Sequence, residues 1–305
     1  MNHIVECVPN FSEGRRIETI KHLTAAVESV NETFVLGTHV DADHNRSVIT
    51  FVSPPGNIVE AAVRTVATAV NLIDLGTHTG EHPRIGATDV LPFVPVRGVS
   101  MDQCVVLAHE AGERIGSELQ IPVYFYERAA LRPDRARLEK VRQRGFEDLR
   151  ERIGIEPERA PDAGPRRLHK TAGAIAVGAR PFLIAFNVNL RSNDVSIARR
   201  IARAVRERDG GLPFLKALGF ELQSRGLVQV SMNLIDYERT GLTEAFAAVQ
   251  QQAEFLNVDI EGAEIVGFVP EAALDRNAPY FPRLENFSEQ TILENCLRAR
   301  LTEKA

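Results

Sequence analysis

"FVLGTHVDADHNRSVITFVSPPGNIVEAAVRTVATAVNLID", residues 34–74, contains two apolar stretches around a polar turn and then a long segment with helical periodicity. Residues 34–41 and 46–53 are typical of two strands joined by a hairpin loop. In residues 56–74 the apolar side chains recur at alternating intervals of four and three residues, which predicts a helix with one buried face. The residues of this face are Val59, Val63, Val66, Val70 and Ile73.

The flanking segments complete a β-α-β-β-α-β order. Residues 3–14 predict a strand and a turn, residues 15–30 a helix, and residues 88–96 a further strand. The second half of the chain repeats this order: strand 181–190, helix 194–208, extended segments 218–224 and 226–236, helix 241–256 and strand 263–270. We therefore predict an α+β fold of two ferredoxin-like (βαββαβ) subdomains.

The segments between the two repeats predict further elements. They are an amphipathic helix over 101–119, a strand over 121–127, a charged helix over 135–153 and a loop rich in Pro, Gly and charge over 154–173. Because such a loop is typical of a boundary, we expect subdomains at residues 1–178 and 179–305. The last helix is expected to begin near Ser288.

The composition limits the classes of function. A net charge of -5 provides no general attraction for nucleic acid or an anionic membrane, so a small acidic metabolite fits better. Cys7, Cys104 and Cys296 are widely separated, which argues against a disulfide framework or a thiolate metal site. No apolar run has the length of a signal peptide or a membrane span, and we expect a reducing, cytoplasmic location.

The segment "THTGEHPRIGATDV", residues 77–90, holds two histidines four residues apart. His78 and His82 have the spacing of a zinc pair on a helix, but Gly80 and Pro83 disfavour a helix there and no thiolate lies nearby. A solvated loop histidine and a positioned acid–base histidine are the other two readings. For the acid–base reading, Glu81 or Asp89 could orient the imidazole and Arg84 could hold an anion beside it. We expect no metal.

Two further polar clusters flank the first repeat's strands. Residues 41–46, "DADHNR", form the expected hairpin loop, where Asp43 and His44 fit ordinary turn residues equally well and the spacing of a calcium loop is absent. "NFSEG", Asn10 to Gly14, follows the first strand; Ser12 could cap the next helix, and the turn could present backbone N–H groups to an anion. Asn187 and Asn189 occupy the matching junction of the second repeat and are expected to face Asn10.

A short basic run, Arg166, Arg167 and Lys170, lies among glycines in the boundary loop, a composition that suits a flexible ligand-binding flap. The arginines of residues 197–208 alternate with apolar residues at helical spacing and are typical of a solvated helix face, with no indication of nucleic-acid binding. Phosphate-binding, dinucleotide-binding and serine-hydrolase motifs are absent from the sequence.

Taken together, the segments resemble the formiminotransferase domain family. The matching stretches include "VECVPNFSEG", "NRSVITFVSPP", "GEHPRIGATDVLPFVPVRGVSM", "PVYFYE", "APDAGP", "GARPFLIAFNVNL", "QVSMNLIDYE" and "VGFVP", in order over nearly the whole chain. The resemblance implies two similar subdomains with a folate groove between their sheets. It also implies that His82 is the catalytic acid–base residue and that Asp41 assists it.

The implied reaction transfers the formimino group of N-formimino-L-glutamate to N5 of tetrahydrofolate, giving 5-formiminotetrahydrofolate and glutamate, a step of histidine degradation. Tetrahydrofolate is then a co-substrate, and we expect a homodimer. Formyl transfer from N-formylglutamate, 5-formyltetrahydrofolate cycling and a non-catalytic folate-binding module are the alternatives. Arg46, Arg84 and Arg97 are candidates to hold the glutamate carboxylates. The residues expected to bind substrate or folate are Asn10, Asn45, Arg46, Arg84, Ala163, Gly164, Pro165, Arg166, Arg167, Leu168, His169, Lys170, Thr171, Ala172, Asn187 and Asn189.

Overall fold

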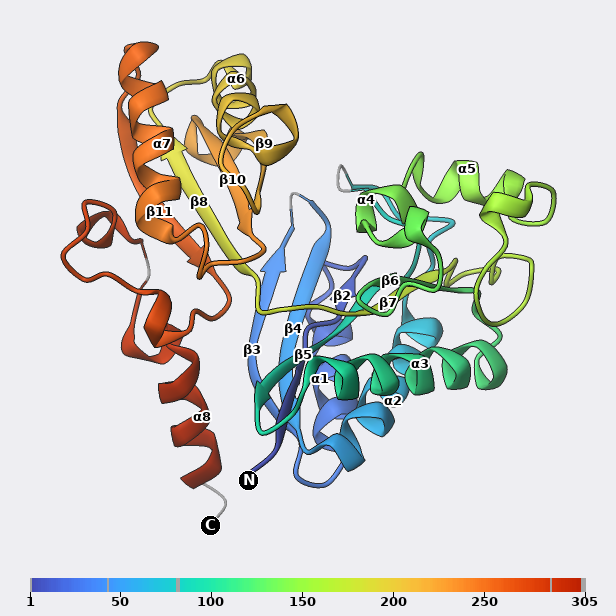
Figure 1. The fold of residues 1–305 in the computed structure, drawn as a ribbon. Helices are drawn as coiled ribbons and strands as arrows, with labels where there is room; N and C mark the ends of the chain where they lie inside the picture. Colours follow the sequence, from blue (N-terminus) through green and yellow to red (C-terminus); the bar gives the residue numbers. More distant parts are fainter. Residues whose placement is uncertain (1, 43, 81–82, 286, 303–305) are drawn as a thin grey trace. The chain divides into compact units, whose positions relative to one another are not determined.

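The computed structural model describes residues 2–42, 44–80, 83–285 and 287–302. The chain forms two compact units, Met1–Arg180 and Pro181–Ala305 (Figure 1). Each unit has its own sheet and its own hydrophobic core. The predicted α+β fold with two βαββαβ repeats is confirmed.

The sheet of the first unit is built around a broken strand. Strands β1 and β2 both pair with β4 and β5, so they act as one strand interrupted at Val8 and Pro9. The strands in the order β3, β4, β1/β2, β5 are antiparallel, and this is the order of a ferredoxin-like repeat. Beyond β5 the sheet continues with β7 and then β6, which run parallel to β5. The strands are β1 Ile4–Cys7, β2 Asn10–Phe11, β3 Phe34–Asp41, β4 Arg46–Ser53, β5 Thr88–Arg97, β6 Val123–Glu127 and β7 Ile175–Ala179.

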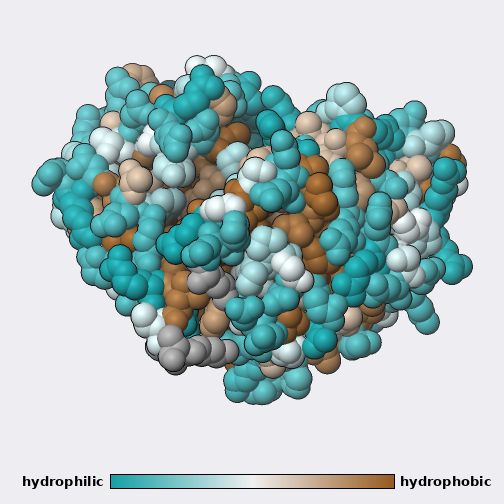
Figure 2. Space-filling model, turned by 60° about the horizontal axis from the view of Figure 1, so that its bottom comes forward, coloured by the Kyte–Doolittle hydropathy of each residue, from teal (hydrophilic) through white to brown (hydrophobic). Residues whose placement is uncertain are grey.

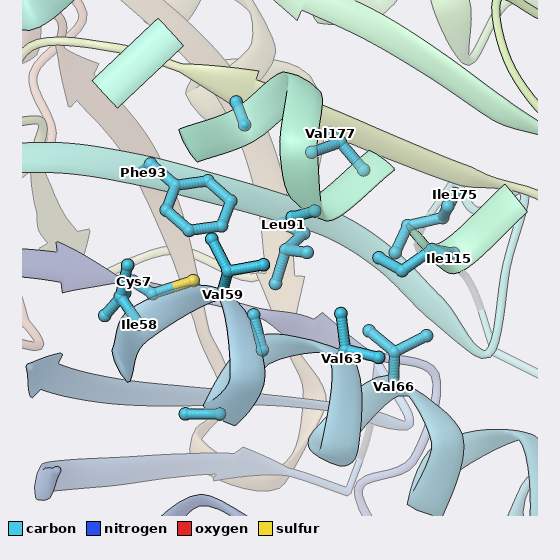
Figure 3. Packing of buried hydrophobic residues seen from close by; sticks show 14 of the residues in the cluster. Cys7, Ile58, Val59, Val63, Val66, Leu91, Phe93, Ile115, Ile175 and Val177 are labelled. Atoms are coloured by element: carbon cyan, nitrogen blue, oxygen red, sulfur yellow. The ribbon is translucent and has the colours of Figure 1, made fainter. Parts of the chain in front are cut away.

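Three long helices cover one face of this sheet: α1 Ile17–Glu28, α2 Pro55–Leu72 and α3 Met101–Glu118. The predicted apolar face of residues 56–74 is buried here. Figure 3 shows Val59 and Val63 of α2 directed toward Leu91 and Phe93 of β5, and Val66 directed toward Ile115 of α3. The segment between α2 and β5 contains the two histidines of the "THTGEHPRIGATDV" stretch.

Shorter elements pack on the other face of β5, β6 and β7. The charged stretch over 135–153 is helical as predicted, but it is interrupted and divides into α4 and α5, with the 3₁₀ turn η1 at its start. Arg144 and Gly145 have φ angles of 67° and 74°, a left-handed geometry that no α-helix continues through. The short elements are η1 Pro133–Arg135, α4 Leu138–Val141, α5 Gly145–Arg152 and η2 Pro157–Arg159. They bury Tyr124 and Tyr126 together with Val141, Leu149 and Ile153.

The second unit has the strand order β11, β8, β10, β9, which is antiparallel throughout and repeats the ferredoxin-like order. Helices α6 and α7 bury their apolar faces in the core, where the Tyr280 ring contacts Phe186 and Phe246. The elements are β8 Ile184–Leu190, α6 Val195–Val205, η3 Glu207–Asp209, β9 Leu215–Leu222, η4 Gln223–Arg225, β10 Leu227–Leu234, α7 Leu242–Phe255, β11 Ile260–Val266, η5 Glu271–Ala273 and η6 Phe281–Arg283.

The last helix, α8, covers Leu293–Thr302 and starts later than the predicted Ser288. A separate 3₁₀ turn, η7 Glu289–Thr291, comes first, because the backbone N–H of Ser288 donates to the Thr291 hydroxyl at 3.2 Å and closes that turn.

Hydrophilic side chains dominate the face of the molecule drawn in Figure 2, with smaller hydrophobic areas between them. This agrees with a sequence in which a quarter of the residues are charged. Within the described ranges, no helix is both long and apolar enough to cross a membrane.

Candidate active site

A small pocket in the first unit collects most of the polar residues that the sequence singled out there. It lies where β2, the β3–β4 turn, the loop after α2 and the start of β5 meet, and its cavity volume is about 10 Å³. A cavity of this size holds roughly one water molecule and is far smaller than the roughly 300–1,000 Å³ of pockets for whole ligands. It is lined by Phe11, Ser12, His44, Asn45, Arg46, His78, Arg84 and Asp89.

Asp41 ends β3 and its carboxylate is held by His44. The backbone N–H of His44 donates to Oδ1 at 2.9 Å, and Nδ1 of the imidazole lies 2.6 Å from Oδ2. Partial burial by itself raises the pKa of Asp41, but the hydrogen bonds and charge of His44 outweigh it and lower the pKa to about 2. Asp41 is therefore an anion at neutral pH, with His44 as its bound partner.

Asn45 ties the hairpin turn to two other segments. Its φ of 50° is tolerated by Asn better than by most residues. Its Oδ1 accepts from the backbone N–H of Gly14 at 2.9 Å, and its Nδ2 donates to the Thr79 carbonyl at 2.9 Å. A side chain at Gly14 would collide with the Asp41 carbonyl, since a Cβ there would lie 2.0 Å from that oxygen. The "NFSEG" junction, the turn and the histidine loop are thus fixed against each other.

Arg46 begins β4 and points its guanidinium toward the same pocket, where Nη2 donates to Oδ1 of Asn10. Burial lowers the pKa of Arg46 to about 10, and the positive charge of Arg142 adds to the effect, while Asp89 and Asp41 oppose it. The side chain still carries its charge at neutral pH. Asn10 and Arg46, two of the predicted binding residues, are therefore in direct contact.

Arg84 and Arg142 add two more cations around the pocket. Nη2 of Arg84 donates to the His78 carbonyl at 3.1 Å and to Glu147 at 3.2 Å. Arg142, which the sequence did not single out, forms an ion pair with Oδ2 of Asp89. The Nε atoms of Arg84 and Arg142 are buried and have no hydrogen-bond partner among the described residues. Buried guanidinium donors of this kind suit a carboxylate ligand.

Asp89 is held by two other groups, and Ser12 does not have the capping role that the sequence suggested. Besides Arg142, the Asp89 carboxylate accepts from the backbone N–H of Ile85 at 2.8 Å, so both of its oxygens are already bound. Ser12 is not a helix cap, because α1 begins five residues later and its N-cap position is Arg16. The Ser12 hydroxyl instead donates to the Gly86 carbonyl at 2.8 Å and ties β2 to the segment before β5.

Arg97, a sequence candidate for carboxylate binding, is not part of this pocket. It lies at the far end of β5 opposite Ile4, whereas the pocket contains Asp89 near the start of the strand. Eight residues of strand separate the two positions by about 26 Å, at roughly 3.3 Å per residue.

The predicted folate loop, Ala163–Ala172, is anchored beside the histidine loop. Thr171 accepts from the backbone N–H of Leu75 and Ala172 from that of Ala87, each at 2.9 Å. Nδ1 of His169 accepts from the backbone N–H of Ala172 at 3.1 Å, and burial lowers the pKa of His169. Arg166, Arg167 and Lys170 are exposed. The end of the loop is therefore fixed, while its cations project from the surface.

Asn187 and Asn189 belong to β8 of the second unit, on the sheet face opposite the core. Nδ2 of Asn187 donates to Glu264 at 2.7 Å, and Nδ2 of Asn189 donates to Glu285 at 3.3 Å. Gln229 of β10 donates to both Asn189 Oδ1 and Glu264, at 2.9 and 3.1 Å. Oδ1 of Asn187 has no hydrogen-bond partner in the part of the chain that the structure describes. Whether Asn10 faces these residues stays a prediction.

Three residues of the sequence argument, Asp43, Glu81 and His82, lie outside the described residues. The same holds for any zinc site that would include His82. Among the residues that are described, no group of three His, Cys, Asp or Glu side chains is placed to hold a metal ion.

Comparisons with known proteins agree with this architecture. Residues 4–180 match the model of the N-terminal subdomain of the formiminotransferase domain, and residues 185–301 match the model of the formiminotransferase domain. The chain is 46% identical to a glutamate formimidoyltransferase of Thermoplasma acidophilum, over 95% of this chain and 96% of the relative. It is 43% identical to a glutamate formimidoyltransferase of Streptococcus pyogenes, over 97% of this chain and 99% of that relative. A mouse formimidoyltransferase-cyclodeaminase is 42% identical over 99% of this chain but only 56% of its own length.

Proposed function

Because the chain belongs to the formiminotransferase domain family, we propose that it is a glutamate formimidoyltransferase. The reaction moves the formimino group of N-formimino-L-glutamate to N5 of tetrahydrofolate and releases glutamate, a step of histidine degradation. Full-length similarity to two stand-alone glutamate formimidoyltransferases, at 43 and 46% identity, carries the proposal.

His82 is assigned as the acid–base catalyst. N5 of tetrahydrofolate attacks the formimino carbon and forms a tetrahedral intermediate, and His82 accepts the proton that leaves N5. The bond between that carbon and the glutamate nitrogen then breaks, and His82 returns the proton to this nitrogen. The family motif "GEHPR" supports the role, since a near-neutral histidine pKa suits a proton that is accepted and returned in one cycle.

Asp41 is assigned to stabilise positive charge during the transfer. Its pKa of about 2 keeps it ionised at neutral pH, and its hydrogen bonds to His44 hold its position. The formimino carbon lies between its terminal nitrogen and the glutamate nitrogen, and this unit is cationic when protonated. A fixed carboxylate nearby therefore stabilises the protonated, cationic form.

The cations of the pocket are assigned to the glutamate carboxylates. Arg46 and Arg84 line the pocket, and the unpartnered Nε atom of Arg84 offers a buried donor. Folate is assigned to the groove between the sheets of subdomains 1–178 and 179–305, with contacts from Asn10, Asn45, the loop Ala163–Ala172, Asn187 and Asn189. Oδ1 of Asn187, for which the described part of the chain offers no partner, supports a ligand on that strand.

The proposal includes a cytoplasmic homodimer with tetrahydrofolate as co-substrate and no metal. Cys7, Cys104 and Cys296 are buried and widely separated in sequence, which supports a reducing compartment. Light scattering of the purified protein measures the oligomeric state, and fractionation of the source cells measures the location.

A spectrophotometric assay tests the activity. Purified protein is given tetrahydrofolate with N-formiminoglutamate or N-formylglutamate, and glutamate release is followed with and without EDTA. The proposal expects folate-dependent release from the formimino donor, unchanged by EDTA. Release from the formyl donor alone would favour formyl transfer, and folate binding without turnover would favour a binding module.

A further inference from the structure

His78 lines the pocket beside Arg46 and Arg84, yet the assigned mechanism gives it no role. Its Nε2 lies 3.0 Å from the backbone carbonyl oxygen of Asn45. A carbonyl oxygen can only accept a hydrogen bond, so Nε2 carries the proton. Asn45 is itself held by Gly14 and Thr79, which fixes the direction of this carbonyl and therefore the orientation of the imidazole ring.

The other ring nitrogen, Nδ1, is buried and has no hydrogen-bond partner among the residues described. Burial lowers the pKa of His78; the bond to Asn45 opposes this effect, and the positive charge of Arg84 strengthens it. Glu13 and Arg15 act more weakly, in opposite directions. The ring is thus neutral at physiological pH, with its hydrogen on Nε2. Nδ1 then presents a lone pair, a fixed hydrogen-bond acceptor for which the described residues provide no donor.

We propose that Nδ1 of His78 accepts a hydrogen bond from the terminal nitrogen of the formimino group and thereby makes the enzyme select formimino over formyl donors. The inference rests on the proposed function and adds the residue that sets the choice of donor. The two donors differ at one atom: the formimino group ends in a nitrogen that carries hydrogen, whereas the formyl group ends in an oxygen that only accepts.

The chemistry of this single atom is sufficient for discrimination. A formimino N–H satisfies the lone pair of Nδ1, whereas a formyl oxygen in the same place sets two acceptors against each other in a buried site. Removing one partner of a buried hydrogen bond leaves the other unsatisfied, which is costly. Sites built around such a bond reject analogues that lack the matching group, by about 10⁴–10⁵-fold in the best cases. One neutral bond in a partly enclosed pocket corresponds to roughly 10–100-fold.

The test compares His78→Leu, which removes both ring nitrogens, with His109→Leu as a matched control. His109 on α3 also has Nε2 close to a backbone carbonyl, 2.8 Å from the Ala129 oxygen, but it does not line the pocket. For each protein kcat/KM is measured with N-formiminoglutamate and with N-formylglutamate at the same tetrahydrofolate concentration, and circular dichroism checks the fold.

We expect the wild type to prefer the formimino donor. In His78→Leu the ratio of kcat/KM values for the two donors should fall by at least about 10-fold, mostly because kcat/KM for the formimino donor falls. His109→Leu keeps the wild-type ratio. His78→Gln, which offers both an amide donor to Asn45 and an acceptor oxygen, retains more of the preference than His78→Leu. A folded His78→Leu that loses activity equally with both donors would contradict the proposal, because a merely structural role lowers both together.

Calorimetry with the wild type and the folded His78→Gln and His78→Leu variants provides a second measurement that does not depend on turnover. The proposal expects N-formiminoglutamate to bind the wild type at least about 10-fold more tightly than N-formylglutamate. Equal affinities would overturn the role of His78. If the wild type turns over neither donor, the proposed activity fails; the role of His78 is then decided by whether His78→Leu, once shown to be folded, loses the difference in affinity between the two donors.

Discussion

Arg142 and Asp89 form a buried ion pair although 53 residues separate them in the chain. The side chain of Asp89 is 5% exposed and that of Arg142 is 14% exposed. The pair joins the segment between α4 and α5 to the start of β5, next to the pocket. Because Arg142 also lies close enough to Arg46 to lower its pKa, Asp89 offsets part of the positive charge that gathers there.

Arg142→Leu is expected to destabilise the protein by about 3 kcal/mol, since it leaves the Asp89 carboxylate buried without its cation. Urea denaturation followed by circular dichroism measures the loss. Arg64→Leu is the control: Arg64 pairs with Glu60 on the surface of α2, where the two side chains are 50% and 37% exposed, and its loss should cost less than about 1 kcal/mol. Equal losses in both variants would refute a special role for the buried pair.

Asp41 should make the stability of the folded protein depend on pH in the acidic range. The fold lowers the pKa of Asp41 from the ordinary value of 3.8 to about 2, so the folded state favours the ionised form. The stabilisation is therefore complete above about pH 4 and is lost as the pH falls toward 2. In urea titrations across this range, Asp41→Asn should lose less stability than the wild type. Parallel curves for the two proteins would show that Asp41 is not held in its charged form.

His82→Asn is expected to keep the fold and the affinity for folate while turnover falls by roughly 10²-fold or more, the usual scale for loss of an acid–base group. Steady-state kinetics and a binding titration with 5-formyltetrahydrofolate provide the two readouts. Turnover within a few-fold of the wild type would remove His82 from the mechanism.

Residues 1–178 and 179–305, expressed separately, should each bind 5-formyltetrahydrofolate far more weakly than the whole chain, because the proposed groove needs both sheets. Each unit has its own hydrophobic core, so circular dichroism can first establish whether each half is folded. Recovery of binding on mixing would support the groove. Near-wild-type affinity in one folded half would place the ligand within that half.

The periodic spacing of apolar residues was sufficient to predict the main helices and strands of the fold. The spacing of Val59, Val63 and Val66 predicted the buried face of α2, and residues 34–41 and 46–53 match β3 and β4 residue for residue. Strand β7 was missed, because its five residues form a short apolar segment directly after the loop that was taken as the boundary. The break at Arg144 and Gly145 was missed because the surrounding charged residues fit a continuous helix equally well.

The site was predictable where its residues are neighbours in sequence and not where tertiary contacts define it. Asn45 and Arg46 stand out in a polar turn, and the structure places both in the pocket. Arg142 lies in a charged stretch of ordinary appearance, and only its contact with Asp89 reveals its position. His78 was considered only as half of a zinc pair. The Asn45 carbonyl, which is distant in sequence, fixes the ring so that Nδ1 has no partner among the residues that the structure describes.

Transfer of a labelled carbon tests the proposed activity most directly. N-formiminoglutamate carrying ¹³C in its formimino carbon is incubated with tetrahydrofolate and the purified protein, and carbon NMR together with mass spectrometry follows the label. We predict that the label moves to N5 of the folate as the 5-formimino product, with one glutamate released for each labelled folate formed. Label that stays on the glutamate derivative, or that appears as free formate or formamide without a labelled folate, would contradict the assignment of this chain as a formimidoyltransferase.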